Sequence, residues 1–271
     1  MQGLLHLYRW LIARKSFYQL NLHLYKLSLR GIGVLNSEGS LATGETAFFK
    51  WLKDNHFHPQ YILDVGANTG DLSLELIKVF PDAQIWAFEP HPKTFKKLKQ
   101  NIHNHKSIHP FQLGLGDNTI KTTLWDFAAS APLKSTQPTS TLSSLNKQVI
   151  THHYHQPAQG YQVQITTLDK VASKHKIRQI DFLKIDTEGH ELAVLKGAKK
   201  LLHNNKIKII QFEFNEIHAY SKVFMKDFVE LLDNFDLYRL LPDGPALLGP
   251  YRPVTHEIFG FQNIAAISRI K

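Results

Sequence analysis

Short apolar runs alternate with longer segments of helical spacing over most of the chain, beginning at Tyr61. Each run has the length of a buried strand, and each intervening segment places apolar residues three or four positions apart, as an amphipathic helix does. This alternation predicts βαβ units, a mostly parallel sheet and helices on both of its faces. The predicted strands are residues 61–65, 84–88, 109–115, 180–185, 207–214, 237–241 and 261–268. The predicted helices are residues 71–80, 92–104, 191–202 and 225–232.

The alternation stops in the middle of the chain. Residues 128–160 are rich in Ser, Thr, Gln, Pro and His and show no clear period. Long loops without regular structure are usually functional or disordered, so we expect a lid-like insertion here, between strands at 121–127 and 161–167. A second irregular stretch, residues 242–253, is rich in proline and glycine and is predicted to be a loop.

Residues 1–42 precede this pattern and form a separate N-terminal segment. The α/β domain is therefore predicted to span residues 43–271. Residues 1–30 carry five Lys or Arg and no acid, and their apolar residues recur at helical spacing. This pattern predicts a basic amphipathic helical segment. Such a segment can cap the domain, join two copies as a homodimer, or lie on an anionic membrane surface. We prefer capping or the dimer contact.

Composition sets outer limits on these interpretations. With 271 residues, 43% of them hydrophobic, the chain suffices for one large α/β domain and the N-terminal segment. It has no cysteine, which excludes disulfides, thiolate chemistry and zinc held by cysteine. No apolar stretch reaches the ~20 residues of a membrane helix. We expect a cytoplasmic protein, with peripheral membrane contact as the alternative. The net charge of +9 suits phosphate-bearing partners or is simply that of a basic surface.

The strongest chemical motif lies between the first predicted strand and the first predicted helix. Gly66 and Gly70 permit a tight turn and a close approach of the backbone to a ligand, at the strand end where open α/β sheets bind ligands. Glu89 ends the second strand, 19 residues after Gly70. A carboxylate there can accept the hydroxyl hydrogens of a ribose. Together the two features predict nucleoside binding. The loop reads Asp64-Val65-Gly66-Ala67-Asn68-Thr69-Gly70.

The glycine spacing favours S-adenosylmethionine over a dinucleotide. A dinucleotide loop reads G-x-G-x-x-G and holds a pyrophosphate, whereas Asn68 stands where the middle glycine would be. S-adenosylmethionine has no pyrophosphate, and its ammonium group needs an acid or a carbonyl nearby. Asp64 is the candidate for that contact, with turn closure as its alternative role. Asp117, after the third strand, is the candidate acceptor for the adenine amino group, or else a plain turn residue.

Several further motifs follow in a fixed order: Phe88-Glu89-Pro90, Leu183-Lys184-Ile185-Asp186-Thr187-Glu188-Gly189-His190-Glu191, Val194-Leu195-Lys196-Gly197-Ala198 and Gln211-Phe212-Glu213-Phe214. With the glycine loop, they resemble the FkbM family of S-adenosylmethionine-dependent methyltransferases. The resemblance runs from about Gly44 to Ser268, and residues 186–198 are its most discriminating part. The Gly44-Glu45 pair also resembles the family, which makes Glu45 a cofactor-binding candidate.

The resemblance implies the Rossmann-like class I methyltransferase fold, with seven mostly parallel strands of which the last is antiparallel. It also implies S-adenosylmethionine as the cofactor and O-methylation of a hydroxyl on a sugar, a glycoconjugate or a natural product. We therefore expect a small-molecule or carbohydrate substrate. The histidine-rich lid and the basic N-terminal segment match no feature of the family, so the identity of the acceptor stays open.

Methyl transfer to a hydroxyl requires alignment, exclusion of water and a base that removes the proton. Two polar clusters follow the fourth and fifth predicted strands, and they should meet opposite the glycine loop. Asp186 and His190 belong to the first cluster, and Glu213 and His218 to the second. We prefer one of the two histidines as the base, because neutral imidazole suits proton abstraction near pH 7. Asp186 is also a cofactor-binding candidate. No dedicated metal site is predicted, although Mg²⁺ on Asp186, Glu213 and Asn215 is an alternative.

Other functions stay open as alternatives. The basic charge favours an RNA or other nucleic-acid methyltransferase. Against it, no Asn/Asp-Pro-Pro-aromatic tetrapeptide follows the fourth strand, and the acids there would repel a phosphate backbone. No nucleic-acid partner is therefore expected. The missing middle glycine disfavours a nicotinamide-dependent oxidoreductase. A non-catalytic binding protein with the same fold is a further alternative, against which the intact Asp64, Glu89 and Asp186 argue.

Overall fold

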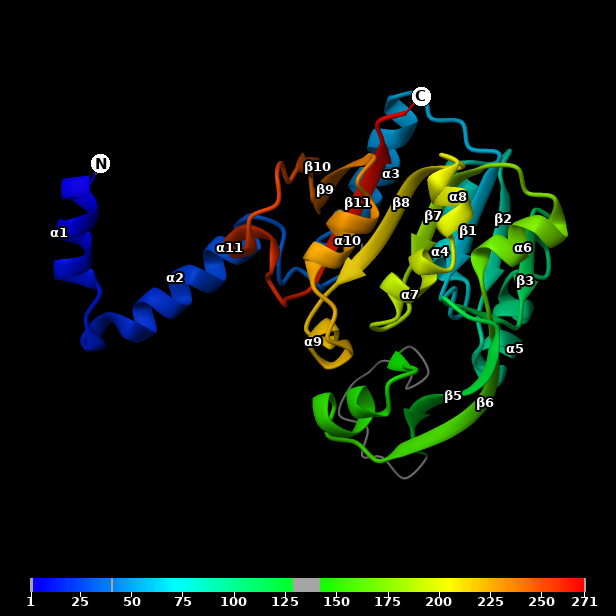
Figure 1. The fold of residues 1–271 in the computed structure, drawn as a ribbon, viewed down its shortest axis with the longest axis horizontal. Helices are drawn as coiled ribbons and strands as arrows, with labels where there is room; N and C mark the ends of the chain where they lie inside the picture. Colours follow the sequence, from blue (N-terminus) through cyan, green and yellow to red (C-terminus); the bar gives the residue numbers. More distant parts are fainter. Residues whose placement is uncertain (1, 40, 129–141, 271) are drawn as a thin grey trace.

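The computed structural model describes residues 2–39, 41–128 and 142–270. Within these ranges, a large sheet of eight strands runs in the order β10-β9-β11-β8-β7-β1-β2-β3 (Figure 1). The strands from β3 to β8 are parallel, and β11 is antiparallel to both of its neighbours. Their bounds are β1 Tyr61–Val65, β2 Gln84–Phe88, β3 Ile108–Phe111, β7 Ile180–Ile185, β8 Ile207–Phe214, β9 Phe235–Leu241, β10 Gly244–Leu247 and β11 Gln262–Ser268.

This topology confirms the predicted class I methyltransferase fold, with one strand more than the predicted seven. The extra strand is β10, which forms an antiparallel hairpin with β9. The loop prediction for residues 242–253 is therefore wrong over β10 and over the start of the short helix α11, Pro253–His256. Pro245 lies within β10, and proline in a sheet is confined to edge strands, where a missing N–H breaks no ladder bond. Proline and glycine here mark a sheet edge.

Helices cover both faces of the large sheet. On one face, α3 (Glu45–Asp54), α4 (Asp71–Val79) and α5 (Pro92–Asn101) bury their apolar sides against alternate strand residues such as Ile62 and Phe182. On the other face, Leu63 and Leu183 pack against the remaining helices. A sheet buried on both faces needs apolar residues at successive positions, which explains why the strands are continuous apolar runs. These helices are α6 (Leu168–His175), α7 (Glu191–Lys196), α8 (Lys199–His203) and α10 (Met225–Leu231).

Two predicted elements are each divided in two. The helix predicted over residues 191–202 breaks at Gly197, where an added Cβ would lie 2.0 Å from the carbonyl oxygen of Gly116. The strand predicted over residues 109–115 divides into β3, in the large sheet, and β4 (Gly114–Leu115), which pairs with β6 in a second sheet. Both breaks come from contacts between segments far apart in the sequence.

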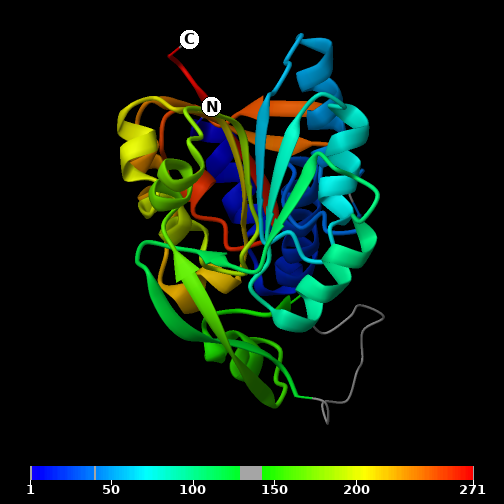
Figure 2. The same cartoon turned by 90° about the vertical axis from the view of Figure 1, so that its right-hand side faces the viewer.

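The second sheet lies beyond the carboxyl ends of the large sheet's strands (Figure 2). In the described part of the chain it has the order β4-β6-β5, and β5 (Ile120–Phe127) and β6 (Ala158–Thr166) confirm the two strands predicted to flank the lid. A π-helical turn at Val149–His153 precedes β6. The predicted lid spans residues 128–160, of which 129–141 lie outside the described residues.

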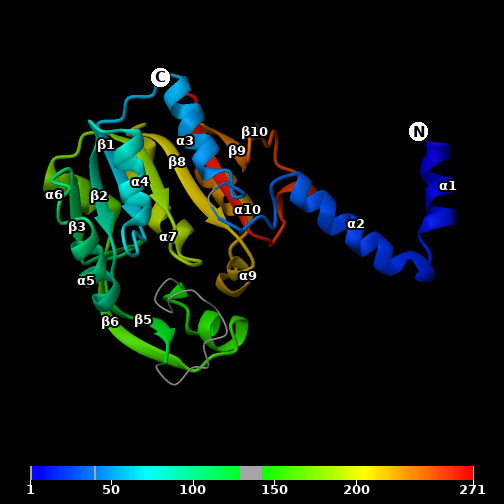
Figure 3. The same ribbon diagram turned by 180° about the vertical axis from the view of Figure 1, so that it is seen from behind.

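The N-terminal segment forms helices α1 (Gln2–Ile12) and α2 (Tyr18–Gly31), which project from the domain (Figure 3). Along α2, Leu29 is the buried residue, and Val34 beyond it is fully buried in the domain. The two helices therefore do not cap the domain, which is one of the two roles preferred from the sequence, and the other role, a dimer contact, stays a prediction. None of the helices in the described ranges is long and apolar enough to cross a membrane.

Candidate active site

The glycine loop that connects β1 to α4 is held by backbone contacts. Gly66 and Gly70 have φ values of +85° and +91°, which favour glycine. A Cβ on Gly66 would lie 1.7 Å from the carbonyl oxygen of Asp186. Asn68, with φ of +48°, adopts the left-handed conformation that asparagine tolerates. The turn after β1 and the turn after β7 thus touch, and only glycine fits at their contact.

Glu89 fixes the next turn. One of its carboxylate oxygens accepts the backbone N–H of Asn68 at 3.0 Å, and the other accepts that of His91 at 2.7 Å. The residue is 6% exposed. Burial raises the pKa of Glu89 to about 7, although the two hydrogen bonds oppose the rise. Each oxygen retains a lone pair for a further donor.

Asp64 lies beneath the glycine loop. It is 1% exposed and accepts a hydrogen bond of 2.6 Å from the Ser73 hydroxyl. Burial raises the pKa of Asp64 to about 6. The residue lines neither of the two cavities that meet at this edge of the sheet. Its contacts are those of a residue that anchors the loop to α4.

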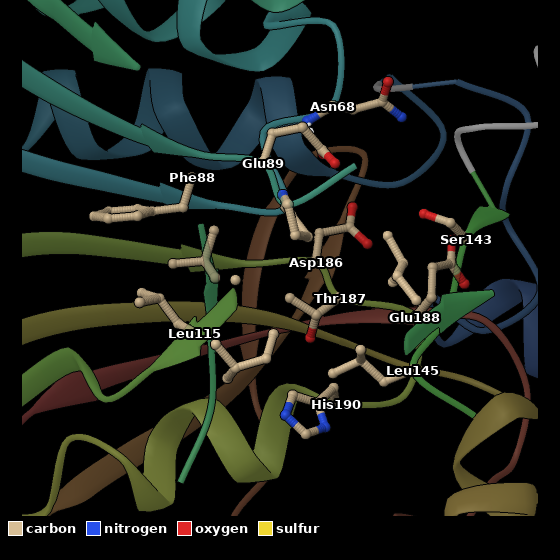
Figure 4. A pocket seen from close by; sticks show the side chains of 16 residues that line it. Asn68, Phe88, Glu89, Leu115, Ser143, Leu145, Asp186, Thr187, Glu188 and His190 are labelled. Carbon is tan, nitrogen blue, oxygen red and sulfur yellow. Dashed lines mark hydrogen bonds between the residues drawn. The ribbon is translucent and has the colours of Figure 1, made fainter. Parts of the chain in front are cut away.

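The first cavity lies between the glycine loop and the second sheet (Figure 4). Glu89 and Asn68 lie at one end of it, and His190 lies toward the other. The Asn68 side-chain oxygen is buried and has no hydrogen-bond partner among the described residues. The cavity thus combines apolar walls with polar groups at its ends and with Asp186 and Thr187 between them. Its apolar walls come from Val65, Phe88, Leu115, Leu124, Leu145 and Ile165.

The second cavity shares Gly66, Asn68, Asp186 and Glu188 with the first. Its other walls carry further acids together with lid side chains. Burial raises the pKa values of Glu188 and Glu213 well above the usual carboxylic range, and neighbouring carboxylates add to the rise. The second cavity is therefore lined by several closely spaced carboxyl groups, and it adjoins the first cavity at the shared residues. The further polar lining residues are Ser37, His153, Tyr154, Glu213, Asn215 and Glu216.

A buried lysine holds these acids together. Lys184 Nζ lies 2.9 Å from Glu45 Oε1 and 3.8 Å from Asp186 Oδ2, and its side chain is 3% exposed. Burial alone would lower the pKa of Lys184, but the charges of Glu45 and Asp186 outweigh it and raise the pKa. Gln211 donates to the same Glu45 oxygen at 2.7 Å. Glu45, predicted to bind the cofactor, thus lies in the cavity's supporting network.

A second buried pair shapes the turn after β7. One oxygen of Glu191 accepts the backbone N–H groups of Thr187 and Gly189 and the Thr187 hydroxyl. The other oxygen lies 3.0 Å from His218 Nε2, and both side chains are 1% exposed. Burial would raise the pKa of Glu191, but the hydrogen bond and charge of His218 lower it to about 2. Because Glu191 bonds the backbone on both sides of Glu188, the pair fixes this turn, in which Glu188 adopts a left-handed conformation with φ of +53°.

The predicted catalytic residues therefore separate into groups. The structure brings Asp186 and Glu213 together in the second cavity. His190 lines the first cavity instead, against Gly116, and burial lowers its pKa. His218 is buried against Glu191 and lines neither cavity. Asp117 is exposed and lies on the far side of His190, outside the first cavity.

The structural roles of Lys184 and Glu191 are not predicted from the sequence. A signal existed for the first of these, because Lys184 is a charged residue inside a mostly apolar predicted strand, in which Asp181 is the other charged residue. For Glu191 no local signal distinguishes a buried anchor from an exposed first-turn residue of a helix. In the described part of the chain, no three His, Asp or Glu side chains are arranged to hold a metal ion.

Comparison with known proteins gives consistent matches. A family model described as "Methyltransferase FkbM domain" matches residues 64–240. The chain is similar to "Methyltransferase 1" of Beauveria bassiana, with 29% identity over 51% of this chain and 57% of that protein, little more than half its length. It is 22% identical to the 2-O-methyltransferase NoeI of Sinorhizobium fredii, over 68% of this chain and 75% of NoeI. It is 26% identical to the hexuronic acid methyltransferase AglP of Haloferax volcanii, over 72% and 70%.

The Glu191–His218 pair predicts a pH-dependent contribution to stability. The pKa of Glu191 is about 2 in the folded protein against an ordinary 4.5. Its stabilising effect is therefore complete above pH 4.5 and is lost as the pH falls from 4.5 toward 2. Glu191→Gln should lower the free energy of unfolding by roughly 3–5 kcal/mol at pH 6, measured by urea denaturation, and by progressively less below pH 4.5.

The matched control is Glu230→Gln, which removes a carboxylate that is 64% exposed and faces Lys226 on the surface. This substitution should change stability by less than about 1 kcal/mol. A difference between wild type and Glu191→Gln that stays constant between pH 6 and pH 3 would contradict the assignment.

Proposed function

The chain belongs to the FkbM methyltransferase family, and on that premise we propose that it transfers a methyl group from S-adenosylmethionine to a hydroxyl of a neutral sugar or glycoconjugate. That it is a methyltransferase follows from the family. One observation supports the acceptor above all. The first cavity, where Glu89 can bind a ribose, adjoins a second cavity lined by carboxyl groups, which leaves space for an acceptor beside the cofactor. The two cavities share Gly66, Asn68, Asp186 and Glu188.

The first cavity fits the nucleoside part of the cofactor. Glu89 would hold the ribose hydroxyls with its free lone pairs, and the apolar walls at Leu115 and Ile165 would cover the adenine. The unpartnered oxygen of Asn68 is a buried acceptor, which is costly unless a ligand donates to it. When bound, S-adenosylmethionine supplies an activated methyl group. The proposal moves the ammonium contact from Asp64, which is anchored to Ser73, to the shared wall at Asn68 and Asp186.

The shared wall also suits the charge of the cofactor. S-adenosylmethionine is cationic at its sulfonium and ammonium groups, and carboxylates at short range stabilise a cation in a site of low dielectric. Asp186 and Glu188 provide them where the two cavities join. After transfer the sulfonium charge is gone, so the same carboxylates hold the product less strongly than the cofactor.

Glu213 is the proposed base in the second cavity. The acceptor hydroxyl must lose its proton as it attacks the methyl group. The cationic cofactor favours the ionised form of Glu213, and an ionised carboxylate with a raised pKa takes that proton more readily than an ordinary one. The side chain of Asn215 donates to Glu213 and orients it. Tyr154 and His153, from the lid, face the same cavity and would exclude water from the bound acceptor. His218 acts indirectly, by holding Glu191 and the turn that carries Glu188.

The acids of the second cavity argue for an uncharged acceptor. A carboxylate or phosphate on the acceptor would lie among Asp186, Glu188 and Glu213, whose raised pKa values indicate that further negative charge is disfavoured there. The named relatives NoeI and AglP are a 2-O-methyltransferase and a hexuronic acid methyltransferase. This chain would share hydroxyl chemistry with the first and differ from the second in the charge of its substrate.

An acceptor panel tests the proposed function. Purified protein with S-adenosylmethionine is offered neutral methyl glycosides, glucuronic acid and glucose 6-phosphate, and products are identified by mass spectrometry. We expect a mass increase of one methyl group on neutral sugars, with kcat/KM at least tenfold above that for either anionic sugar. Equal or better use of the anionic sugars would contradict the acceptor class, while methyl transfer itself would stand.

Glu213→Gln tests the base. The substitution keeps the shape and removes proton acceptance, so kcat on a neutral acceptor should fall by roughly 10²–10⁴-fold. Calorimetric affinity for S-adenosylhomocysteine should change little. The control is Glu216→Gln, a neighbouring exposed carboxylate on the same cavity, which should retain most of the activity. A Glu213→Gln variant with wild-type turnover would eliminate this residue as the base.

Glu89 predicts a pH-dependent cofactor affinity. Ribose hydroxyls donate to the ionised carboxylate, so binding favours the charged form and releases a proton below pH 7. With a pKa of about 7, affinity for S-adenosylhomocysteine should rise with pH up to about 7 and then level off. Glu89→Gln should weaken binding by tenfold or more, about 1.4 kcal/mol, and flatten the pH profile. Asp82→Asn, on an exposed turn, serves as the control. Wild-type affinity that is constant from pH 5 to 8 would refute the contact.

A further inference from the structure

Helices α1 and α2, with the short turn between them, form an N-terminal arm of residues 2–31 that leaves the domain (Figure 3). Large apolar side chains are exposed along its whole length, and Trp10 is 66% exposed. An apolar surface of this extent marks an interaction site. The exposed apolar residues are Leu5, Leu7, Tyr8, Trp10, Leu11, Phe17, Tyr18, Leu20, Leu24, Tyr25 and Leu27.

Both helices are amphipathic with a wide apolar side. At 3.6 residues per turn, His6 and Arg9 fall on one narrow side of α1, and the apolar residues cover the rest. On α2, a polar side carries His23, Lys26 and Arg30, and the leucines and tyrosines take most of the remaining circumference, which a narrow strip of Asn21 and Ser28 interrupts. Helices of this kind lie in the plane of a bilayer surface, with the apolar side in the acyl boundary and the basic side toward headgroups.

The charge of the arm identifies its partner. Residues 1–30 contain five Lys or Arg and no acid, so they contribute +5 of the net charge of +9. Arg30 forms an ion pair with Glu38, at the end where the arm joins the domain. We propose that the arm binds the surface of an anionic lipid bilayer. Tyrosine and tryptophan, which the arm exposes, favour the headgroup region.

A second copy of the chain is a poorer partner for this surface. In a two-fold dimer each patch meets the same patch of its partner, so an arm without acids would face another arm without acids. Anionic headgroups supply the missing counter-charge. With 11 and 14 residues, the two helices are shorter than the ~20 residues that span a bilayer, so the contact is with its surface.

Binding would place the second cavity close to the membrane. The arm joins the domain at Leu29, which is buried, and the chain then runs past Val34 to Ser37, which lines the second cavity. An acceptor presented at the membrane surface would thus lie beside the segment that anchors the protein. Lipid binding itself goes beyond the proposed function, and its test requires no methyl transfer.

Vesicle co-sedimentation of the full chain tests the proposal. Vesicles of equal phosphatidylglycerol and phosphatidylcholine should bind the protein at least tenfold more tightly than pure phosphatidylcholine. The triple variant Arg9→Gln, Arg14→Gln, Lys26→Gln should lose at least tenfold in affinity for the anionic vesicles. The matched control removes three exposed lysines from α5, and it should bind like wild type: Lys96→Gln, Lys97→Gln and Lys99→Gln.

Trp10 provides a reading specific to the arm. Anionic vesicles should shift tryptophan emission to shorter wavelength, and Trp10→Phe should remove that shift while leaving sedimentation nearly unchanged. No binding to anionic vesicles, or equal loss of binding in the α5 control, would overturn the proposal. A stable dimer in the absence of lipid that buries Trp10 and persists in the charge variant would assign the arm to a second copy instead.

Discussion

The candidate site depends on one buried cation, the ammonium group of Lys184, which offsets the repulsion among several neighbouring carboxylates. Parallel strands end at one edge of a sheet, so Asp64, Asp186 and Glu213 are brought together there, and mutual repulsion would oppose folding. Lys184 lies next to Asp64 across the β1–β7 ladder and next to Gln211 across the β7–β8 ladder. Its ammonium contacts both Glu45, at the start of α3, and Asp186. The lysine thus ties the first helix of the domain to the edge of the sheet where the cavities open.

The proposed chemistry depends on carboxyl groups that are buried and that Lys184 does not fully neutralise. Burial is the main cause that raises the pKa values of Glu89, Glu188 and Glu213, and neighbouring carboxylates, which one buried lysine cannot all neutralise, add to the rise. Carboxylates in this condition gain from a cationic ligand and readily accept a proton. In the proposed function, a sulfonium donor and a hydroxyl that must be deprotonated would meet these two needs in neighbouring cavities. We propose that incomplete pairing of the charges is what allows this edge of the sheet to bind and react.

The sequence predicts the sheet much better than it predicts the site. Strands buried on both faces are continuous apolar runs, so β1, β2, β7 and β8 could be placed with correct bounds. Features that depend on contacts between distant segments are not predicted from the sequence. One example is the helix break at Gly197, where the backbone of Gly116 approaches closely. The same limit applies to the site: strand order places Asp186 and Glu213 together, but no local pattern shows that His218 is buried against Glu191. The preference for a histidine base followed from residue type alone, whereas the structure places His218 outside both cavities and His190 in the first one.

Net charge is equally uninformative until it is located. The total of +9 suits phosphate-bearing partners at the active site, yet the cavities there are lined by carboxylates. More than half of that excess belongs to residues 2–30, which project away from the sheet. Salt screens the interaction between exposed charges beyond about 8–10 Å at physiological ionic strength. The charge of each surface therefore acts only on groups close to that surface. The basic arm can then attract an anionic partner while the carboxylate-lined cavity of the same chain attracts a cationic one. The net charge of the chain predicts the partner of neither surface.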